Sequence, residues 1–238
     1  MSEVAGQGGR RERLIKLASA MTFLAIVAVA VLIVITQSRT SGGDTKLEGV
    51  GQVRRLLEGL PQHGMALGEP KAKVALVEFG DLQCPVCRDY SEKVLPRLIE
   101  GQVAAGRARL EFRNYAIIGP ESTVAGAAAL AAGEQGRGWS FVELFYRNQG
   151  PEDSGYVSGT FLTAVARGAG VPNIAKWNRD RRSKRLLGEV AETTHEAANL
   201  GFTGTPSFAL ESSGAVGIEP LGTLPSAGAM ESAIDAAR

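Results

Sequence analysis

The feature that most constrains this chain is a pair of cysteines at the junction between a strand-like and a helix-like segment. Cys84 and Cys87 are the only cysteines among the 238 residues. They follow an apolar segment, residues 74–79, whose composition is typical of a buried strand. In the next segment, residues 88–100, apolar side chains recur at helical spacing. The pattern predicts a strand, a turn that carries both thiols, and a helix that begins at them.

This position should make the first thiol more acidic. The first turn of a helix has unpaired N–H groups and the positive end of the helix dipole, and both stabilise an anion. A cysteine placed there becomes nucleophilic near neutral pH. Pro85 suits the first helical turn, where its missing N–H leaves no hydrogen bond unmade. We therefore expect Cys84 to be the attacking thiolate and Cys87, one turn later, to be the resolving partner.

Three other roles for the cysteine pair compete with redox chemistry. A structural disulfide would close a loop of only about four residues and stabilise the fold by roughly 2 kcal/mol, against nearly 5 for a ~100-residue loop. A zinc site usually needs four Cys or His ligands, and only His63 and His195 remain, far apart in sequence. A chance pair of buried thiols is the third alternative. Redox chemistry is the favoured interpretation, and no metal is expected.

Net charge and composition argue against only one class of protein. The net charge of +1 argues against a nucleic-acid-binding protein, because no strong positive field exists to collect phosphates. The short basic run at residues 179–185 is expected to be a solvated face. A hydrophobic content of 44% is ordinary for a globular protein with a sizeable core.

The N-terminal residues predict a membrane anchor. A basic tail, residues 1–16, precedes an uninterrupted apolar run at residues 17–36. About 20 such residues span a bilayer as a helix, and the basic flank should stay cytoplasmic. A cleaved signal peptide is the alternative, although its apolar region is typically about 7–15 residues. In either case the rest of the chain is exported. We expect a single-pass protein of the cell membrane with its catalytic domain on the extracytoplasmic side.

The rest of the chain predicts an α/β domain. Residues 37–66 are expected to be a linker with a short juxtamembrane helix, and residues 67–238 a single domain. After the strand at 74–79, the helix should kink at Pro96, and residues 107–115 alternate as a half-buried strand. Later helices are predicted within 116–149, 160–167, 172–180, 184–200 and 227–238, with a hairpin at 206–210 and 215–218.

Three separate stretches carry a resemblance to a known family. Residues 78–88, Glu-Phe-Gly-Asp-Leu-Gln-Cys-Pro-Val-Cys-Arg, resemble the DsbA-like thioredoxin-fold disulfide oxidoreductases, especially the membrane-anchored forms. Residues 132–139 and 200–208 add two further matches in the same order. The resemblance covers about residue 67 to the end. It implies a thioredoxin fold, a central mixed sheet flanked by helices, with an all-helical insertion at about 118–199 and a single N-terminal transmembrane helix before it.

The resemblance also implies a substrate-binding loop. In the family a proline with a cis peptide bond lies beside the cysteine pair and helps to bind the substrate chain. Thr205 and Pro206 occupy the matching place, and cis bonds are largely a proline phenomenon. Without the resemblance, a trans proline that opens a strand would be expected. Thr205 would offer backbone groups to an extended substrate, and Pro85 and Val86 are predicted to contact substrate as well.

Glu78 interrupts an otherwise apolar strand and is a candidate proton carrier. It shares a face with Val74 and Leu76, and the other face is apolar too, which suggests a buried carboxyl with a raised pKa. Its place before Cys84 matches the family's acid beneath the cysteine pair, which would move protons to and from Cys87. A glutamate that points to solvent at a strand end is the alternative.

The predicted function is thiol–disulfide exchange, with the protein as an oxidase that introduces disulfides into exported proteins. The Cys84–Cys87 disulfide would itself be the redox group, with no other cofactor. The resemblance implies a quinone-linked membrane partner of the DsbB or vitamin K epoxide reductase type as reoxidant. The best-known oxidases carry His before the second cysteine, whereas this chain has Val86, so a milder potential is expected. The alternatives are an extracytoplasmic reductase or isomerase, for example in cytochrome maturation, and a non-catalytic thioredoxin-like binding module.

Overall fold

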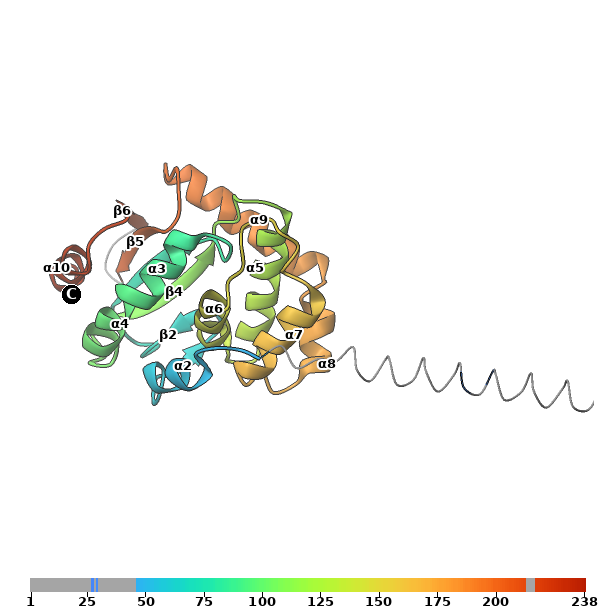
Figure 1. The fold of residues 1–238 in the computed structure, drawn as a ribbon. Coiled ribbons are helices and arrows are strands. Elements are labelled where there is room, and N and C mark those ends of the chain that lie inside the picture. The colour runs from blue at the N-terminus through green and yellow to red at the C-terminus, as the bar shows by residue number, and fades with distance from the viewer. Residues whose placement is uncertain (1–26, 28, 30–45, 213–216) are drawn as a thin grey trace, which may run out of the picture. The chain divides into compact units, whose positions relative to one another are not determined.

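The centre of the protein is a mixed β-sheet (Figure 1). The computed structural model describes residues 46–212 and 217–238, together with Val27 and Val29. The sheet has six strands in the order β1-β2-β4-β3-β5-β6. They are β1 (Gln62–His63), β2 (Ala66–Leu67), β3 (Val74–Gly80), β4 (Arg109–Asn114), β5 (Ser207–Ser212) and β6 (Ile218–Thr223). β3 lies in the middle of the sheet, parallel to β4 and antiparallel to β5. The cysteine turn follows the end of β3 and is therefore next to the central strand.

β3 is buried along its whole length because both faces of the sheet are covered. Leu76 belongs to the large core beneath the helices, whereas Val77 and Phe79 face a smaller cluster that contains Phe202. This is the two-sided burial that a continuous apolar strand predicts. β4 alternates instead, with every second side chain buried, as its alternating sequence predicts.

The helix that follows the cysteines is interrupted near its proline. α3 (Pro85–Lys93) ends at Val94, and α4 (Leu95–Leu98) then leads into a π-helical turn, η1 (Ile99–Val103). Proline at position 96 has no N–H to donate to the preceding turn, so the continuous ladder breaks just before it. The expected kink is therefore a break between two short helices.

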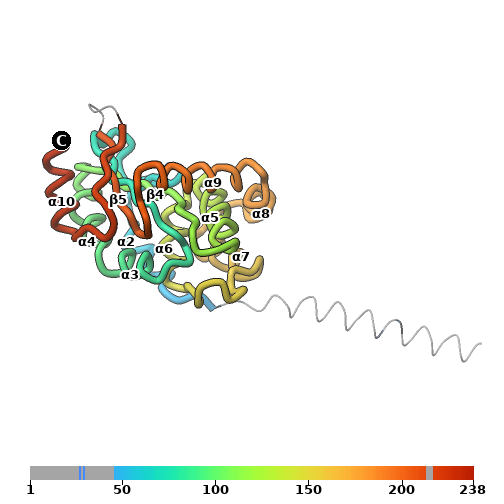
Figure 2. Tube along the Cα trace, turned by 90° about the horizontal axis from the view of Figure 1, so that it is seen from above, coloured from blue at the N-terminus to red at the C-terminus, as the bar shows by residue number. Residues whose placement is uncertain are grey.

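An all-helical block fills the interval between β4 and β5, where the insertion was expected. It consists of α5 (Pro120–Gly133), α6 (Gly138–Arg147), α7 (Gly159–Gly168), α8 (Ile174–Asp180) and α9 (Lys184–Asn199). Ser158, Asn173 and Ser183 cap the last three of these helices by accepting a backbone N–H from the first turn. Figures 1 and 2 both show this block to one side of the sheet, with α10 (Ala227–Ala236) on the opposite side.

The segment expected to be a linker, residues 37–66, contributes to the domain itself over its described part. α2 (Val50–Leu56) packs against α6, and Val53 and Leu57 are buried in the large core. β1 and β2 extend the sheet beyond β4, which the sequence did not predict because two-residue strands show no periodicity.

The second strand of the C-terminal hairpin was predicted wrongly. It was expected at residues 215–218, but β6 begins at Ile218 and continues to Thr223. β6 accommodates Pro220 because it is the last strand of the sheet, an edge position at which a missing N–H is tolerated. Residues 213–216 lie outside the described residues.

One part of the expected fold class is corrected. The predicted fold included an N-terminal transmembrane helix at residues 17–36, but the part of the chain that the structure describes contains no helix long and apolar enough to cross a membrane. Apart from Val27 and Val29, the predicted segment and the basic tail, residues 1–16, lie outside the described residues. The fold that the structure supports is the thioredoxin-like α/β domain with its helical insertion.

Candidate active site

The two cysteines lie at the start of α3, directly beyond the end of β3. Cys84 is the N-cap residue, with an extended backbone, and its sulfur accepts the backbone N–H of Cys87 at 3.4 Å. Pro85 is in the first helical turn, as its missing N–H predicts. Both cysteines are free thiols. The side chain of Cys84 is 7% exposed and that of Cys87 0%, so the first thiol is the one that a partner can reach.

The surroundings shift the pKa values of the two thiols in opposite directions. A hydrogen bond from the Cys87 side chain lowers the pKa of Cys84 to about 6, against the opposing effect of burial. The Thr205 side chain and the first backbone N–H groups of α3 lower it further. Burial raises the pKa of Cys87 well above its usual value, and the neighbouring Cys84 and Glu78 add to that effect. At neutral pH the arrangement therefore favours a thiolate at Cys84 and a protonated thiol at Cys87.

The loop before β5 meets the cysteines from the other side. The Thr205–Pro206 peptide bond is cis, the geometry that the family resemblance implied. The thiol of Cys84 lies 3.6 Å from the carbonyl oxygen of Thr205, within hydrogen-bonding reach for sulfur. Ser207 shapes this loop, because its hydroxyl donates to the carbonyl of Gly204 at 2.7 Å. The fold thus brings Thr205 and Pro206 to the cysteine pair.

Pro85 and Val86 are the exposed residues of the Cys-Pro-Val-Cys turn. The side chain of Val86 is 42% exposed beside the accessible thiol. Leu224, also exposed, donates its backbone N–H to the carbonyl of Pro206. Exposed apolar side chains thus occur in the first turn of α3 and in the segment after β6, and the role of Pro85 and Val86 in substrate contact stays a prediction.

Glu78 is buried inside the sheet rather than exposed at its edge. It is 2% exposed and stands in register between Phe112 of β4 and Phe208 of β5. Neither carboxyl oxygen has a hydrogen-bond partner among the described residues. Burial raises the pKa of Glu78 to about 8, and the charges of Glu143 and Cys84 add to the shift. A carboxyl in this state can hold or give up a proton near neutral pH, which is what a proton carrier for Cys87 requires.

Gln149, from the helical insertion, holds the cysteine turn in place. Its side-chain amide donates to the carbonyl of Leu82 at 2.8 Å and to that of Cys84 at 3.1 Å. Sequence reasoning missed this residue, because a glutamine outside any helix or strand has no local signal that points to a distant backbone.

Asp81 holds the other side of the cysteine turn in place through hydrogen bonds to backbone N–H groups. Its buried carboxylate accepts the backbone N–H of Gln83 at 2.8 Å. It also accepts the N–H groups of Ile117 and Ile118, at 2.9 and 3.0 Å, and so ties the loop after β4 to the cysteine turn. The sequence contained a hint, since Asp is a preferred residue for bonding the backbone two positions on.

A cavity of about 280 Å³ borders the cysteine turn. Its lining residues are Gln83, Pro85, Arg88, Gln149, Gly150, Pro151 and Glu152, and neither cysteine is among them. Two larger cavities lie elsewhere on the domain, one of about 370 Å³ against α2 and α6 and one of about 330 Å³ beside β4 and α9.

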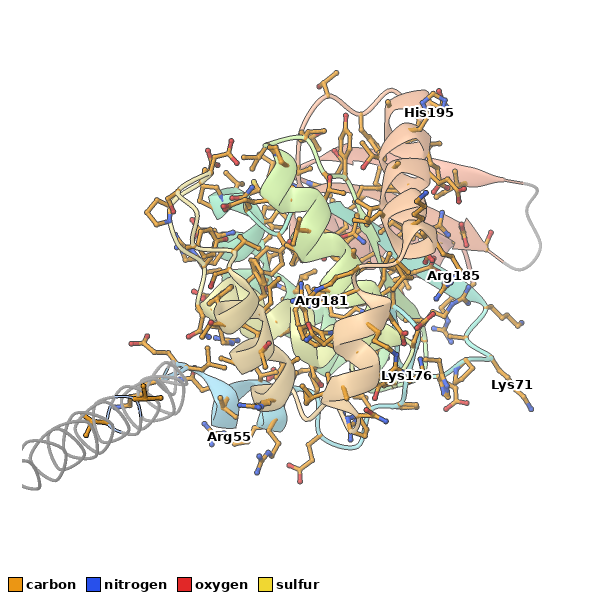
Figure 3. The ribbon with its side chains drawn as sticks, turned by 90° about the vertical axis from the view of Figure 1, so that its right-hand side faces the viewer. Arg55, Lys71, Lys176, Arg181, Arg185 and His195 are labelled. Carbon is orange, nitrogen blue, oxygen red and sulfur yellow. The ribbon has the colours of Figure 1, made fainter. Side chains whose placement is uncertain are left out.

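Two basic residues of α8 and α9, Lys176 and Arg185, pair with acids (Figure 3). Arg179 and Lys184 are exposed, as a solvated face predicts. Lys176 pairs with Asp180 at 2.5 Å, and Arg185 pairs with Glu134. The guanidinium of Arg181, expected to be solvated, is buried 5.0 Å from the ring centre of Trp177. His195 is exposed on α9.

Comparisons with known proteins point to one family. The Thioredoxin family model matches residues 61–216. The probable disulfide bond formation protein D of Bacillus cereus is 32% identical over 146 residues, which cover 60% of this chain and 67% of the relative. A thioredoxin-like oxidoreductase from Silicibacter pomeroyi DSS-3 has a similar structure, with a TM-score of 0.58 and 28% identity over 78% of this chain and 96% of that one.

Oxidised BdbD from Bacillus subtilis shares the fold, with a TM-score of 0.64 and 18% identity over 75% of this chain and 95% of its own. The residues matched by the family model include β3, both cysteines and the Thr205–Pro206 loop, so the match contains the whole candidate site. The chain belongs to the thioredoxin family, as a DsbA-like thiol–disulfide oxidoreductase.

Proposed function

We propose that this protein is an oxidase that transfers its Cys84–Cys87 disulfide to thiols of exported proteins. The observation that carries the proposal is the split between the two thiols, with the pKa of Cys84 lowered to about 6 and that of Cys87 raised. A stabilised thiolate favours the reduced form of the enzyme, and a disulfide whose reduced form is stabilised is a stronger oxidant. The named relatives are disulfide bond formation proteins, which supports the same direction.

The reaction proceeds through a mixed disulfide. A substrate thiolate attacks Cys84 Sγ, the Cys84–Cys87 bond breaks, and Cys87 leaves with the electron pair. Because Cys87 is fully buried, its sulfur takes a proton from the carboxyl of Glu78. A second substrate thiolate then attacks the substrate sulfur and releases Cys84 as a thiolate. The substrate has lost two electrons to form a disulfide, and the enzyme has gained them as a dithiol.

The substrate chain would bind along the loop that contains Thr205. An extended segment could pair with the backbone of this loop, as strands add to exposed polar backbone elsewhere. Exposed Val86, two residues after Cys84, would supply one apolar contact, and exposed Leu224, whose backbone N–H donates to the carbonyl of Pro206, would supply another. The cavity beside Pro85 would take a neighbouring substrate side chain.

The reduced enzyme must pass two electrons on. We propose a quinone-linked membrane protein of the DsbB or vitamin K epoxide reductase type as the acceptor, with the Cys84–Cys87 pair as the enzyme's own redox group and no added cofactor. The setting is extracytoplasmic, where disulfides form and persist. The relatives named for disulfide bond formation support this setting.

The deciding experiment is the reduction potential of the Cys84–Cys87 pair, measured by equilibration in glutathione buffers. A value toward about −120 mV supports the oxidase, and a value near about −270 mV contradicts it in favour of a reductase. A reductase is the competing candidate function. Val86 favours it, because its side chain offers no hydrogen-bond donor to the Cys84 thiolate. A Cys84→Ser variant that retains function in vivo would instead indicate a binding module.

A further inference from the structure

The cavity of about 280 Å³ beside the cysteine turn carries charge of both signs. Arg88, the residue after Cys87 on α3, and Glu152, on the loop between α6 and α7, both line it. Its lining, as far as the described residues form it, contains neither Thr205 nor Pro206. The cavity is therefore separate from the loop along which the substrate chain would pair, and the reaction proposed above uses neither of its charges.

Arg88 is half-buried and has no acidic partner among the described residues. Its neighbour on α3, Asp89, pairs with Lys93 at 3.0 Å. Glu92 comes four positions after Arg88, a spacing at which opposite charges on a helix can meet, yet the two form no ion pair in the described part of the chain. Because an arginine keeps its charge throughout the physiological pH range, this guanidinium is left to water or to a ligand.

The charge of Arg88 acts on the loop that contains Glu152. Burial raises the pKa of Tyr156, which belongs to this loop, whereas the charge of Arg88 lowers it. The ring of Tyr156 packs over Gly150, a lining residue of the cavity, because a methyl group built on Gly150 would lie 2.7 Å from it. The charge of Arg88 therefore reaches the part of the loop that lines the cavity.

The glutamine side chains of the cavity already donate their hydrogen bonds within the protein. Gln83 is fully buried, donates to the hydroxyl of Ser122 at 3.0 Å and accepts the backbone N–H of Asp153 at 2.9 Å. Gln149 donates to two carbonyls of the cysteine turn. Among the described side chains that line the cavity, Arg88 is the donor that remains for a ligand.

The balance of charge in the cavity favours an anion. Glu152 is more exposed than Arg88, so water and salt screen its charge more strongly. Pro85, in the first turn of α3, also lines the cavity, and the positive end of the helix dipole therefore lies beside it. The volume is just below the ~300–1,000 Å³ typical of small-molecule pockets, which suits one side chain of a larger ligand.

We propose that this cavity is a subsite for an acidic side chain of the substrate, and that Arg88 is the residue that recognises it. The guanidinium fork matches a carboxylate and can donate two parallel hydrogen bonds to it. The protein would then react preferentially with chains that carry Asp or Glu close to the reacting cysteine.

The inference rests on the proposed function, because it names the class of substrate that reaches Cys84. The bland alternative is that Arg88 is a solvated cation on α3 that distinguishes no substrate from another. That role predicts the same relative rates for acidic and neutral substrates whether or not the guanidinium is present. A ratio of rates therefore separates the two.

The test measures how fast the oxidised full-length protein reacts with cysteine peptides that differ at one position. In each set, one residue within two positions of the cysteine is Glu, Gln or Lys. The ratio of the Glu rate to the Gln rate is compared among wild type, Arg88→Gln and Arg179→Gln, which removes the same charge from an exposed site on α8. A ratio within one variant cancels changes in the reactivity of its disulfide. A comparison across variants cancels differences in the thiol pKa of the peptides.

For at least one peptide position, the ratio should fall about two- to fivefold in Arg88→Gln, the effect of one partly exposed ion pair. It should stay unchanged in Arg179→Gln. Glu152→Gln removes a repelling charge and should raise the ratio. Added salt should lower the wild-type ratio, because it screens the ion pair.

Equal ratios in wild type and Arg88→Gln at every peptide position overturn the proposal. An equal fall in Arg179→Gln also overturns it, because attraction by net charge would then be sufficient. A preference for Lys that Glu152→Gln abolishes overturns it in favour of a basic side chain. If Arg88→Gln does not fold, Arg88→Met keeps the apolar stem and permits the same comparison.

The reduction potential decides the proposed function separately. A value typical of a reductase would remove the oxidase assignment and leave the peptide preference in place, because exchange in either direction passes through the same mixed disulfide.

Discussion

The thiol of Cys84 lies 3.6 Å from the carbonyl oxygen of Thr205, although 121 positions separate the two residues. One side of the site is a helix start, and the other is the loop that leads into β5. Their meeting places the reactive sulfur beside the backbone of the Thr205–Pro206 loop, where the proposed substrate chain would bind.

The acidity of Cys84 should be measurable directly. Thiolate absorbance at 240 nm in the reduced protein should titrate with a midpoint of about 6. Because this pKa is lowered from 9.0, the thiolate stabilises the reduced fold fully above pH 9, and the stabilisation is lost as the pH falls to about 6. Thermal unfolding of the reduced protein should follow the same window.

Two variants at Cys87 test which hydrogen bonds lower the pKa of Cys84. The hydrogen bond from the Cys87 thiol has the largest lowering effect, so Cys87→Ala should raise the Cys84 midpoint. Cys87→Ser keeps a donor at the same place and should restore part of the shift. Equal midpoints in wild type and Cys87→Ala would assign the acidity to the helix start instead.

Replacing Glu78 by Gln should stabilise the protein and slow its reoxidation. The raised pKa of Glu78 means that folding costs free energy above the unfolded value of 4.5, increasingly up to pH 8. At pH 7 the variant should gain on the order of 3 kcal/mol in free energy of unfolding, from about 1.4 kcal/mol per pH unit. Reoxidation should be slower, because Cys87 has lost its proton acceptor. Denaturant unfolding at pH 4 is the control, where the two proteins should differ little.

Val86 should limit the oxidising strength. A Val86→His variant places a hydrogen-bond donor and a potential positive charge near the Cys84 thiolate, and the exposed position has room for the ring. Its reduction potential in glutathione buffers should become less negative than that of the wild type. Val86→Leu adds volume without a donor and should leave the potential unchanged. A shift of equal size in both variants would show that packing, not hydrogen bonding, sets the potential.

Gln149→Leu should loosen the cysteine turn. It removes the two hydrogen bonds to the carbonyls of Leu82 and Cys84, and the loss should cost about 1–3 kcal/mol in free energy of unfolding. Gln135→Leu is the matched control, because Gln135 bonds the backbone of Asn173 at an exposed site. If both variants lose the same free energy of unfolding, the hydrogen bonds of Gln149 to the cysteine turn contribute no more to stability than those of an exposed glutamine.

Some features of the fold follow from local sequence patterns. The burial of β3 on both faces, the alternation of β4 and the helix start at Cys84 were all predicted, because each depends on periodicity or a capping position within a few residues. The same reasoning placed Glu78 on the face it occupies. It failed for β6, which continues to Thr223 where the expected strand ended at residue 218, and for β1 and β2, which are too short to show a period.

The sequence by itself determined the chemistry that is available, two thiols at a strand–helix junction with an acid in the strand before them. Only the tertiary structure decided how that chemistry is tuned. The order of strands in the sheet places β5 beside β3, and the loop before β5 thereby brings Thr205 to Cys84. Acidities depend on burial and on charges within a few ångströms, and those neighbours come from distant parts of the chain whose placement no local pattern encodes.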